Sequence, residues 1–273
     1  MKVVLFCGGE GMRIREHAGP IPKPMVQIGH RPILWHIMRY YAHYGHRDFI
    51  LCLGNGAEYI KDYFVNYAGH GSNDFVLEHG RVDLLQSDIE DWRITFVHTG
   101  LEASVGERLM AVRPYLDGEE VFLANYADGL SDAPLHRMIE YRDALDRACV
   151  FVGVPPNYTS HVFESDADGN VSAFRHATRA GLRINGGFFV LHARVFDYMR
   201  EGEELVEEPL QRMIAAGDVA AWKHDGFWAC MDTFKEKRML EDLQSGGAAP
   251  WEVWRPRHAG DGAMARLPRL VGT

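Results

Sequence analysis

Two patterns of apolar and polar residues alternate along the chain. Short apolar runs bounded by glycine or polar residues are typical of buried strands, and longer stretches with apolar residues every three or four positions are typical of amphipathic helices. Residues 74–98 lack a helical period and are expected to form irregular strands. The other predicted strands span residues 3–7, 48–53, 120–125, 148–154, 184–191 and 219–224. The predicted helices span residues 32–44, 57–67, 107–115, 134–147, 208–216 and 233–243.

The order of these elements predicts the fold class. Strands and helices alternate through much of the chain, which is typical of a doubly wound α/β fold with a mostly parallel sheet. Residues 160–174 depart from this alternation, because their pattern centres on Asp168 and Gly169 and predicts a β-hairpin.

The first predicted strand leads into a turn that contains Gly8, Gly9 and Gly11. Glycines after a parallel strand let backbone N–H groups approach an anion closely, so this turn is a candidate phosphate site. The sequence is neither a P-loop, which needs a Lys-Ser or Lys-Thr pair, nor a dinucleotide fingerprint, which needs a further glycine. Taken alone, the glycines fit a plain tight turn equally well.

Two cations follow the glycine turn. Arg13 and Lys23 would supply the positive charge that a polyphosphate requires. Pro22 and Pro24 flank Lys23 and bias the backbone there toward an extended conformation, which suits a lysine held toward a site.

Asp128 and Asp232 each follow an apolar run and have small neighbours. In open α/β sheets the ligand crevice lies beyond the carboxyl ends of the strands, so Asp128 should face the same crevice as the glycine turn. Two carboxylates together with phosphate oxygens are a typical set of magnesium ligands. The alternative for an aspartate at a strand end is a turn or a helix cap.

Composition narrows the classes of partner. The 273 residues carry a net charge of −9, which argues against nucleic acid or an anionic membrane as partner, because either would favour a basic surface. The sequence shows neither a signal-peptide pattern nor an apolar run long enough to span a bilayer. The four cysteines are widely spaced and predict neither a disulfide framework nor a metal site. A cytoplasmic protein is expected.

Six segments, in order along residues 1–254, resemble the sugar nucleotidyltransferases and, within them, the glucose-1-phosphate cytidylyltransferases. They are GGEGMR (8–13), PKPMVQIGHRPILWHIM (22–38), FLANYADGLSD (122–132), INGGFFVL (184–191), EEPL (207–210) and HDGFWACMDT (224–233). The resemblance implies one Rossmann-like nucleotidyltransferase domain over residues 1–254. Insertions at about 155–225 would form a small β-rich acceptor lobe. Residues 255–273 are expected to form a mobile tail.

The resemblance also implies the chemistry. Asp128 and Asp232 would hold the catalytic Mg²⁺, and an acceptor phosphate would attack the α-phosphorus of a nucleoside triphosphate and release pyrophosphate. Arg13 would stabilise the leaving group, and Lys23 would neutralise the α-phosphate or the incoming phosphate. The acceptor is already an anion, so no general base is needed.

Further roles carry over residue by residue. Arg108 matches an arginine of the nucleotide loop, and its alternative is a surface arginine at a helix start. Asn185, Gly186 and Glu208 match positions at the sugar. Related cytidylyltransferases form homo-oligomers, so a homo-oligomer is expected here, with the aromatic residues of 222–254 at its interface.

The sequence departs from the family pattern mainly on the acceptor side. The family's Arg-Phe-Gly and Glu-Lys-Pro segments are replaced by Ser160-His161-Val162 and His176-Ala177-Thr178. The nearby Arg175, Arg179 and Arg183 are candidates for the acceptor phosphate, although a planar guanidinium does not replace a lysine without shifting the ligand. A different sugar 1-phosphate or a non-sugar phosphate, such as a phosphorylated amino acid or polyol, therefore becomes a candidate acceptor.

The nucleotide loop is also altered, since the family's Thr-Gly-Gly-Arg reads Val105-Gly106-Glu107-Arg108. CTP is the expected donor from the resemblance alone. A rival hypothesis is a non-catalytic nucleotide-binding protein of the same fold, because fold alone does not fix function.

Overall fold

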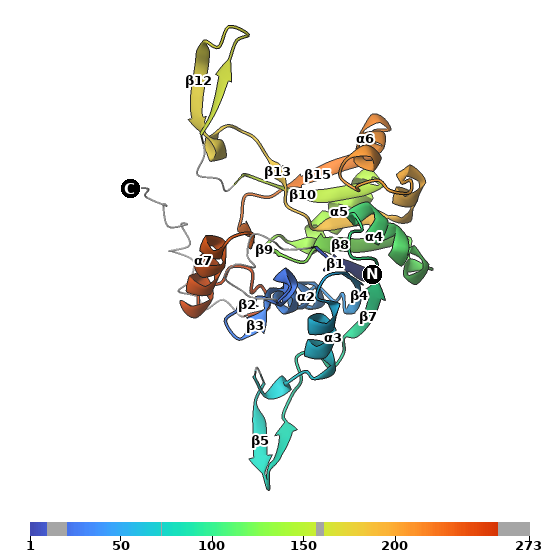
Figure 1. Cartoon of the computed structure of the whole chain (residues 1–273), viewed down its shortest axis with the longest axis vertical. Helices are drawn as coiled ribbons and strands as arrows, with labels where there is room; N and C mark the ends of the chain where they lie inside the picture. Colours follow the sequence, from blue (N-terminus) through green and yellow to red (C-terminus); the bar gives the residue numbers. More distant parts are fainter. Residues whose placement is uncertain (10–20, 72, 157–160, 256–273) are drawn as a thin grey trace.

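In the computed structural model we describe residues 1–9, 21–71, 73–156 and 161–255 (Figure 1). In the eight-stranded sheet, β7 (Arg93–His98), β4 (Asp48–Leu53), β1 (Lys2–Phe6) and β8 (Val121–Tyr126) lie side by side and run parallel, with β7 at the edge. The buried apolar runs of β1, β4 and β8 match the predicted pattern.

The other half of the sheet contains its antiparallel strands. The antiparallel strand β14 (Phe189–His192) follows β8, and β10 (Cys149–Val154) comes next. Strand β10 also pairs with β13 (Ile184–Asn185) in the antiparallel sense and with β15 (Val219–Lys223) in the parallel sense. The predicted mostly parallel, Rossmann-like sheet is thus confirmed, with an antiparallel insertion.

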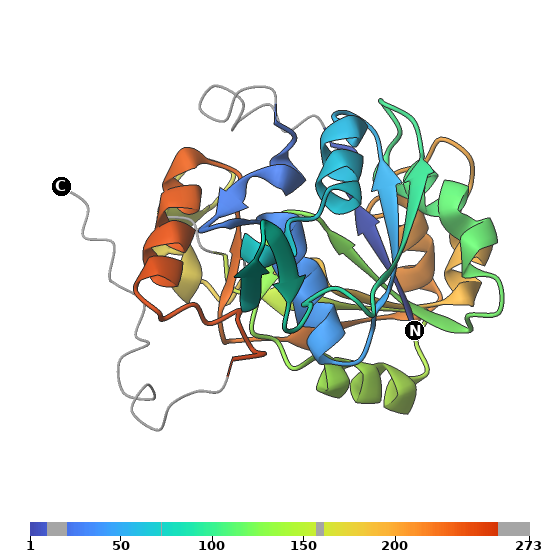
Figure 2. The same ribbon diagram turned by 90° about the horizontal axis from the view of Figure 1, so that it is seen from below.

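Helices cover both faces of this sheet (Figure 2). Alternate residues of β1 point to opposite faces, because Val3 and Leu5 join one buried cluster while Val4 and Phe6 join the other. The first cluster takes in residues of α2 (Ile33–His43), α3 (Ala57–Val65), α5 (Leu135–Leu145) and α7 (Phe234–Ser245). The second takes in residues of α4 (Val105–Val112) and α6 (Glu208–Ala215). The predicted helices therefore exist, with ends that differ by a few residues.

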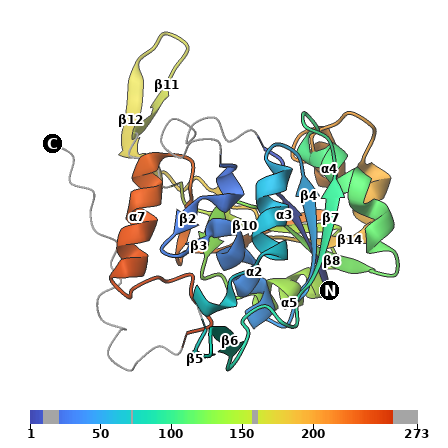
Figure 3. The same ribbon diagram turned by 60° about the horizontal axis from the view of Figure 1, so that its bottom comes forward.

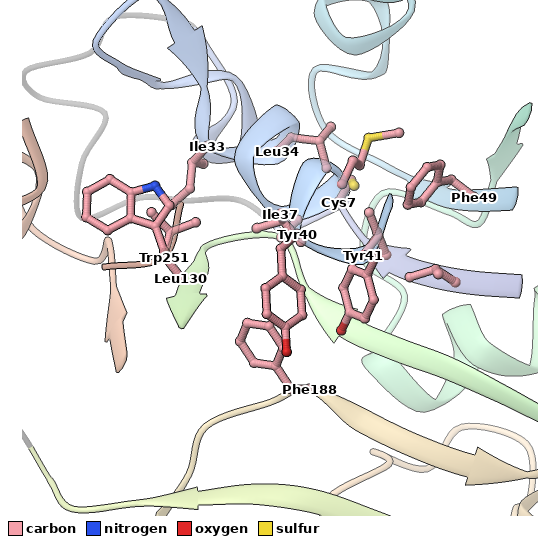
Figure 4. Packing of buried hydrophobic residues seen from close by; sticks show 14 of the residues in the cluster. Cys7, Ile33, Leu34, Ile37, Tyr40, Tyr41, Phe49, Leu130, Phe188 and Trp251 are labelled. Atoms are coloured by element: carbon pink, nitrogen blue, oxygen red, sulfur yellow. The ribbon is translucent and has the colours of Figure 1, made fainter. Parts of the chain in front are cut away.

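Helix α2 forms the centre of the larger cluster (Figure 4). Its apolar residues recur at helical spacing and are almost all buried, as a helix pressed against a sheet requires. Tyr40 and Tyr41 contact the ring of Phe188, at centroid distances of 5.2 and 6.1 Å. This contact ties α2 to the loop between β13 and β14.

Two hairpins project from opposite ends of the molecule (Figure 1). The predicted hairpin around Asp168 is confirmed as β11 (His161–Ser165) and β12 (Val171–His176). Within residues 74–98, β5 (Phe75–Glu78) and β6 (Arg81–Leu84) form the second hairpin ahead of β7. In Figure 3 the β11–β12 hairpin extends beyond the layered body, and the β5–β6 hairpin is seen foreshortened.

The aromatic residues of 222–254 are mostly buried or partly buried, with Phe234, which is 45% exposed, as an exception; the interface expected there stays a prediction. Trp251 is only 1% exposed, and Trp222, Phe227, Trp228 and Trp254 pack against the same core. The exposed apolar side chains instead concentrate on the β5–β6 hairpin, where Leu77 is 66% exposed.

The described residues bear on the predictions made for membrane spans, cysteines and the C-terminal tail. Among the described residues, no helix is long and apolar enough to cross a membrane. All four cysteines are free thiols, and Cys230 is the least buried of them. The predicted tail at 255–273 lies outside the described residues, apart from Arg255.

Candidate active site

A cleft of about 440 Å³ opens beyond the carboxyl ends of β1 and β8. Gly9, Lys23, Arg108, Asp128 and Asp232 all line it, although they come from distant parts of the sequence. The prediction that the glycine turn and Asp128 face one crevice is therefore confirmed. Gly11 and Arg13 lie outside the described residues, so their predicted roles stay predictions.

A short two-stranded ribbon brings the two aspartates together. Strand β9 (Gly129–Ser131) begins immediately after Asp128, and β16 (Trp228–Cys230) ends two residues before Asp232. The strands pair antiparallel, with Cys230 opposite Gly129. Beyond this pair, the Met231 N–H donates to the Asp128 carbonyl at 2.9 Å. Both carboxylates consequently leave the same end of the ribbon.

The far end of the ribbon is fastened by Asp132. Its Oδ1 accepts from the Phe227 N–H at 2.7 Å and lies 2.8 Å from His224 Nε2. The Ser131 hydroxyl donates to the Phe227 carbonyl at 2.8 Å. Gly226 is required in this turn, because an added Cβ would lie 2.6 Å from Asp132 Oδ1.

Lys23 lies between the two aspartates. Its Nζ is 2.6 Å from Asp128 Oδ2 and 2.5 Å from Asp232 Oδ1, and its side chain is 14% exposed. Burial disfavours the charged form of Lys23, but the two carboxylates outweigh this effect and raise the pKa above its usual value. The lysine is therefore a charged, hydrogen-bonded cation at the end of the cleft.

The donor set suits a hard divalent cation. Two carboxylate oxygens converge on one point, and an open cleft leaves room for further oxygen ligands from phosphate and water. Cys230 and Glu236 also lie close to Asp232. However, Glu236 accepts from the Asp232 and Thr233 N–H groups at 2.8 Å and caps α7, so it orients Asp232. Burial and then the neighbouring carboxylates raise the pKa of the Cys230 thiol to about 12. A thiol is also a soft ligand, whereas hard divalent cations such as Mg²⁺ prefer oxygen.

The side chain of Arg108 holds the glycine turn through hydrogen bonds. It is 4% exposed, so its reading as a surface arginine is wrong. Its guanidinium donates to the Gly8 carbonyl at 3.0 Å, to Gly100 at 2.9 Å and to Thr99 Oγ1 at 2.8 Å. An added Cβ at Gly8 would lie 2.1 Å from this guanidinium, which explains the need for glycine there. Arg108 also lines the cleft, which leaves its predicted contact with a nucleotide open.

The acceptor-side residues Asn185 and Gly186 lie where β13 breaks off before β14. Phe188, in the break, has φ of +51° although it is 1% exposed, a conformation that costs energy for a bulky residue. Asn125 Oδ1 accepts from the Phe188 N–H at 2.9 Å and holds this conformation. The Trp228 indole donates to the Gly186 carbonyl at 2.8 Å, so the β9–β16 ribbon and the segment of Asn185 and Gly186 are joined directly.

None of the predicted acceptor residues lines the cleft, although Asn185 Nδ2 lies 3.5 Å from the hydroxyl of Tyr126, which does line it. Glu208 is exposed at the start of α6, and Arg175 lies on the projecting β12, where it pairs with Glu164 at 2.9 Å. Arg179 follows in a short 3-10 helix. Of the described residues, those that line the cleft include none of these three.

Comparison with known proteins identifies the family. Over 257 residues, the chain is 38% identical to a probable glucose-1-phosphate cytidylyltransferase of Bacillus subtilis (strain 168), a match that covers 93% of this chain and 100% of the relative. It is 37% identical, with the same coverage, to glucose-1-phosphate cytidylyltransferase of Salmonella typhi. The chain belongs to the glucose-1-phosphate cytidylyltransferase family. No family model matches the chain.

Structural comparison agrees at the level of the fold. The UTP-bound UGPase from Acinetobacter baumannii superposes with a TM-score of 0.65 over 91% of this chain and 95% of its own, at 17% identity. As a member of the cytidylyltransferase family, the chain is a nucleotidyltransferase that acts on sugar phosphates.

Within this member of the cytidylyltransferase family, the structure adds site residues that the sequence did not reveal. Glu204 lines the cleft, and its Oε2 accepts from the Val105 N–H at 3.0 Å. Tyr126 also lines it, and its hydroxyl accepts a long, 3.5 Å contact from Asn185 Nδ2. Glu204 lies four residues before the predicted Glu208, and no local pattern distinguishes the two. The sequence offered only one sign of Glu204, which is that it is an acidic residue in a polar segment.

We expect Asp132→Ala to lower the free energy of unfolding by about 1–3 kcal/mol, because the partly buried Phe227 N–H loses its acceptor. Urea denaturation followed by fluorescence measures this change. Asp225→Ala is the matched control, since Asp225 is 75% exposed and pairs only at the surface with Arg183. Equal losses in the two variants would contradict a fastening role for Asp132.

Proposed function

We propose that the chain is a Mg²⁺-dependent cytidylyltransferase that transfers CMP from CTP to a sugar 1-phosphate and releases pyrophosphate. The observation that carries this proposal is the convergence of Asp128 and Asp232 beside the glycine turn in one cleft. The match with cytidylyltransferases over 93% of the chain supports CTP as the donor.

The chain's own residues position the reactants. Gly8 and Gly9 let the backbone approach the phosphates, while Arg108 keeps the turn in place. Lys23 supplies a mobile positive charge to the phosphates during the displacement. Magnesium, when bound between Asp128 and Asp232, would neutralise the charge of the triphosphate. An acceptor phosphate attacks in line without a general base, so positioning and electrostatics provide the rate enhancement.

The acceptor pocket differs from the family pattern. His161 and His176, which stand in the replaced segments, face each other across the β11–β12 hairpin with ring centroids 5.2 Å apart. Polar groups of Asn185, Tyr126 and Glu204 are available near the cleft for an acceptor rich in hydroxyl groups. These groups favour a sugar phosphate or a phosphorylated polyol over a phosphorylated amino acid.

We also propose a homo-oligomer that is assembled through the β5–β6 hairpin. All eight residues of the two strands are exposed, and an isolated two-stranded hairpin is marginally stable in water. Exposed apolar strands of this kind are typical of an interface.

Asp128→Asn and Asp232→Asn should each lower turnover at least ~100-fold, because each removes one charged metal ligand. Pyrophosphate release is measured with CTP, UTP, dTTP and GTP against a panel of sugar 1-phosphates. Asp225→Asn, an exposed substitution of the same kind, should retain full activity. Full turnover in either site variant would refute the metal assignment, and tight nucleotide binding without pyrophosphate for any acceptor would favour a non-catalytic binding protein.

Glucose 1-phosphate should be a poor acceptor, because a lost charged hydrogen bond to the phosphate costs about 1.5–3 kcal/mol, or roughly 10- to 150-fold. The same panel, extended to phosphorylated amino acids and polyols, gives kcat/KM for each candidate. A kcat/KM for glucose 1-phosphate on the order of 10⁵ M⁻¹s⁻¹ would contradict this prediction, because the pocket would then still use glucose 1-phosphate efficiently.

Leu77→Asp should weaken self-association, because it places a charge on the most exposed large side chain of the β5 and β6 strands. Light scattering across a dilution series measures the mass. Ile214→Asp on α6, which is also an exposed apolar position, is the control and should leave the mass unchanged. A monomeric wild-type protein at micromolar concentration would remove the proposal.

A further inference from the structure

Lys23 holds the two oxygens that the proposed metal would need. Its single ammonium group contacts Asp128 Oδ2 and Asp232 Oδ1 at once. We propose that Lys23 is the resident counter-ion of this aspartate pair, that it excludes a divalent cation from the free protein, and that it turns to the triphosphate when nucleotide and metal arrive together. This inference rests on the proposed function, because it assumes that the pair binds a metal.

An ammonium and a divalent cation cannot share this position. Both are positive and both require the same carboxylate oxygens, so their mutual repulsion at such short distances makes binding competitive. The free chain already satisfies the two negative charges with Lys23. A metal ion that arrives alone must displace a hydrogen-bonded, partly buried ammonium and leave it without a counter-charge.

The local structure lets the ammonium move while the aspartates stay. The Lys23 backbone is fixed in a short 3-10 helix, where its carbonyl accepts from the Val26 N–H at 3.1 Å. Four flexible methylene groups separate this anchor from the charge. Asp232 is oriented independently through its N–H, which donates to Glu236 Oε2, and Asp128 is tied to the ribbon through its carbonyl.

The direction of the movement follows from the cleft. Lys23 and Gly9 line the same cavity of about 440 Å³, so phosphates bound at the Gly9 backbone would share that cavity with the lysine side chain. The phosphates of a triphosphate would supply a new counter-charge for the ammonium when the metal binds the two carboxylates. Metal and nucleotide must therefore bind cooperatively, and by thermodynamic linkage each raises the affinity for the other by the same factor.

The test is a titration of the metal-free, full-length protein with Mn²⁺, followed by electron paramagnetic resonance of the free ion. Lys23→Gln removes the competing charge, and we expect it to bind Mn²⁺ at least ~10-fold more tightly than the wild type, since charged hydrogen bonds no longer oppose the ion. Lys2→Gln, which removes one positive charge from the opposite end of β1, should leave the Mn²⁺ affinity unchanged. Lys23→Arg keeps the charge and should keep the affinity low.

A second titration adds a nucleotide. A CTP analogue with a methylene bridge between the α- and β-phosphorus atoms should raise the Mn²⁺ affinity of the wild-type protein, and should raise that of Lys23→Gln by a smaller factor. Equal Mn²⁺ affinities of wild type and Lys23→Gln, or no Mn²⁺ binding by either protein, would overturn the inference. Tighter Mn²⁺ binding by Lys23→Gln without pyrophosphate release from the wild type on any substrate panel would instead support the inference and reject the proposed function.

Discussion

The pairing of β9 with β16 is the interaction on which the site depends. Asp128 and Asp232 come from segments that are far apart in the sequence, and three residues of each strand bring them to one point. Each carboxylate repels the other, so a ribbon that holds both must be fastened elsewhere. Asp132 provides this fastening at the far end, through the Phe227 N–H and His224. Lys23 compensates the charge at the near end.

The ribbon and its neighbour β8 also contact the loop that follows β13. The Trp228 indole reaches from β16 to the Gly186 carbonyl, and Asn125 reaches from β8 to the Phe188 N–H. Phe188 remains in a left-handed conformation because its ring is packed against α2 and its N–H is satisfied. Strain in this loop is thus supported from β16, which leads to Asp232, and from β8, which leads to Asp128.

Much of the fold could be predicted because its strands and helices are long enough to show a period. The position of Asp128 could be predicted too, since a residue after a central parallel strand must reach the ligand crevice. The ribbon could not, because three-residue strands such as Gly129–Ser131 are too short to display alternation. The burial of Arg108 was equally hidden, since its acceptors are backbone carbonyls of segments such as residues 99–101 that only the fold brings near. The pairing of Lys23 with Asp128 and Asp232 could not be predicted either, because a sequence shows that a lysine is charged but not which side chains lie next to it.

The late position of β16 in the chain has a consequence for biosynthesis. Strand β1, Lys23 and Asp128 leave the ribosome well before Trp228–Cys230, so a nascent chain can assemble much of the parallel sheet while Asp232 is still missing. During this interval β9 lacks its partner strand β16, and Lys23 lacks one of its two carboxylate partners. A growing chain of this kind does not yet have the arrangement of charges that the finished cleft has. The complete cleft therefore forms in one late step, when β16 pairs with β9.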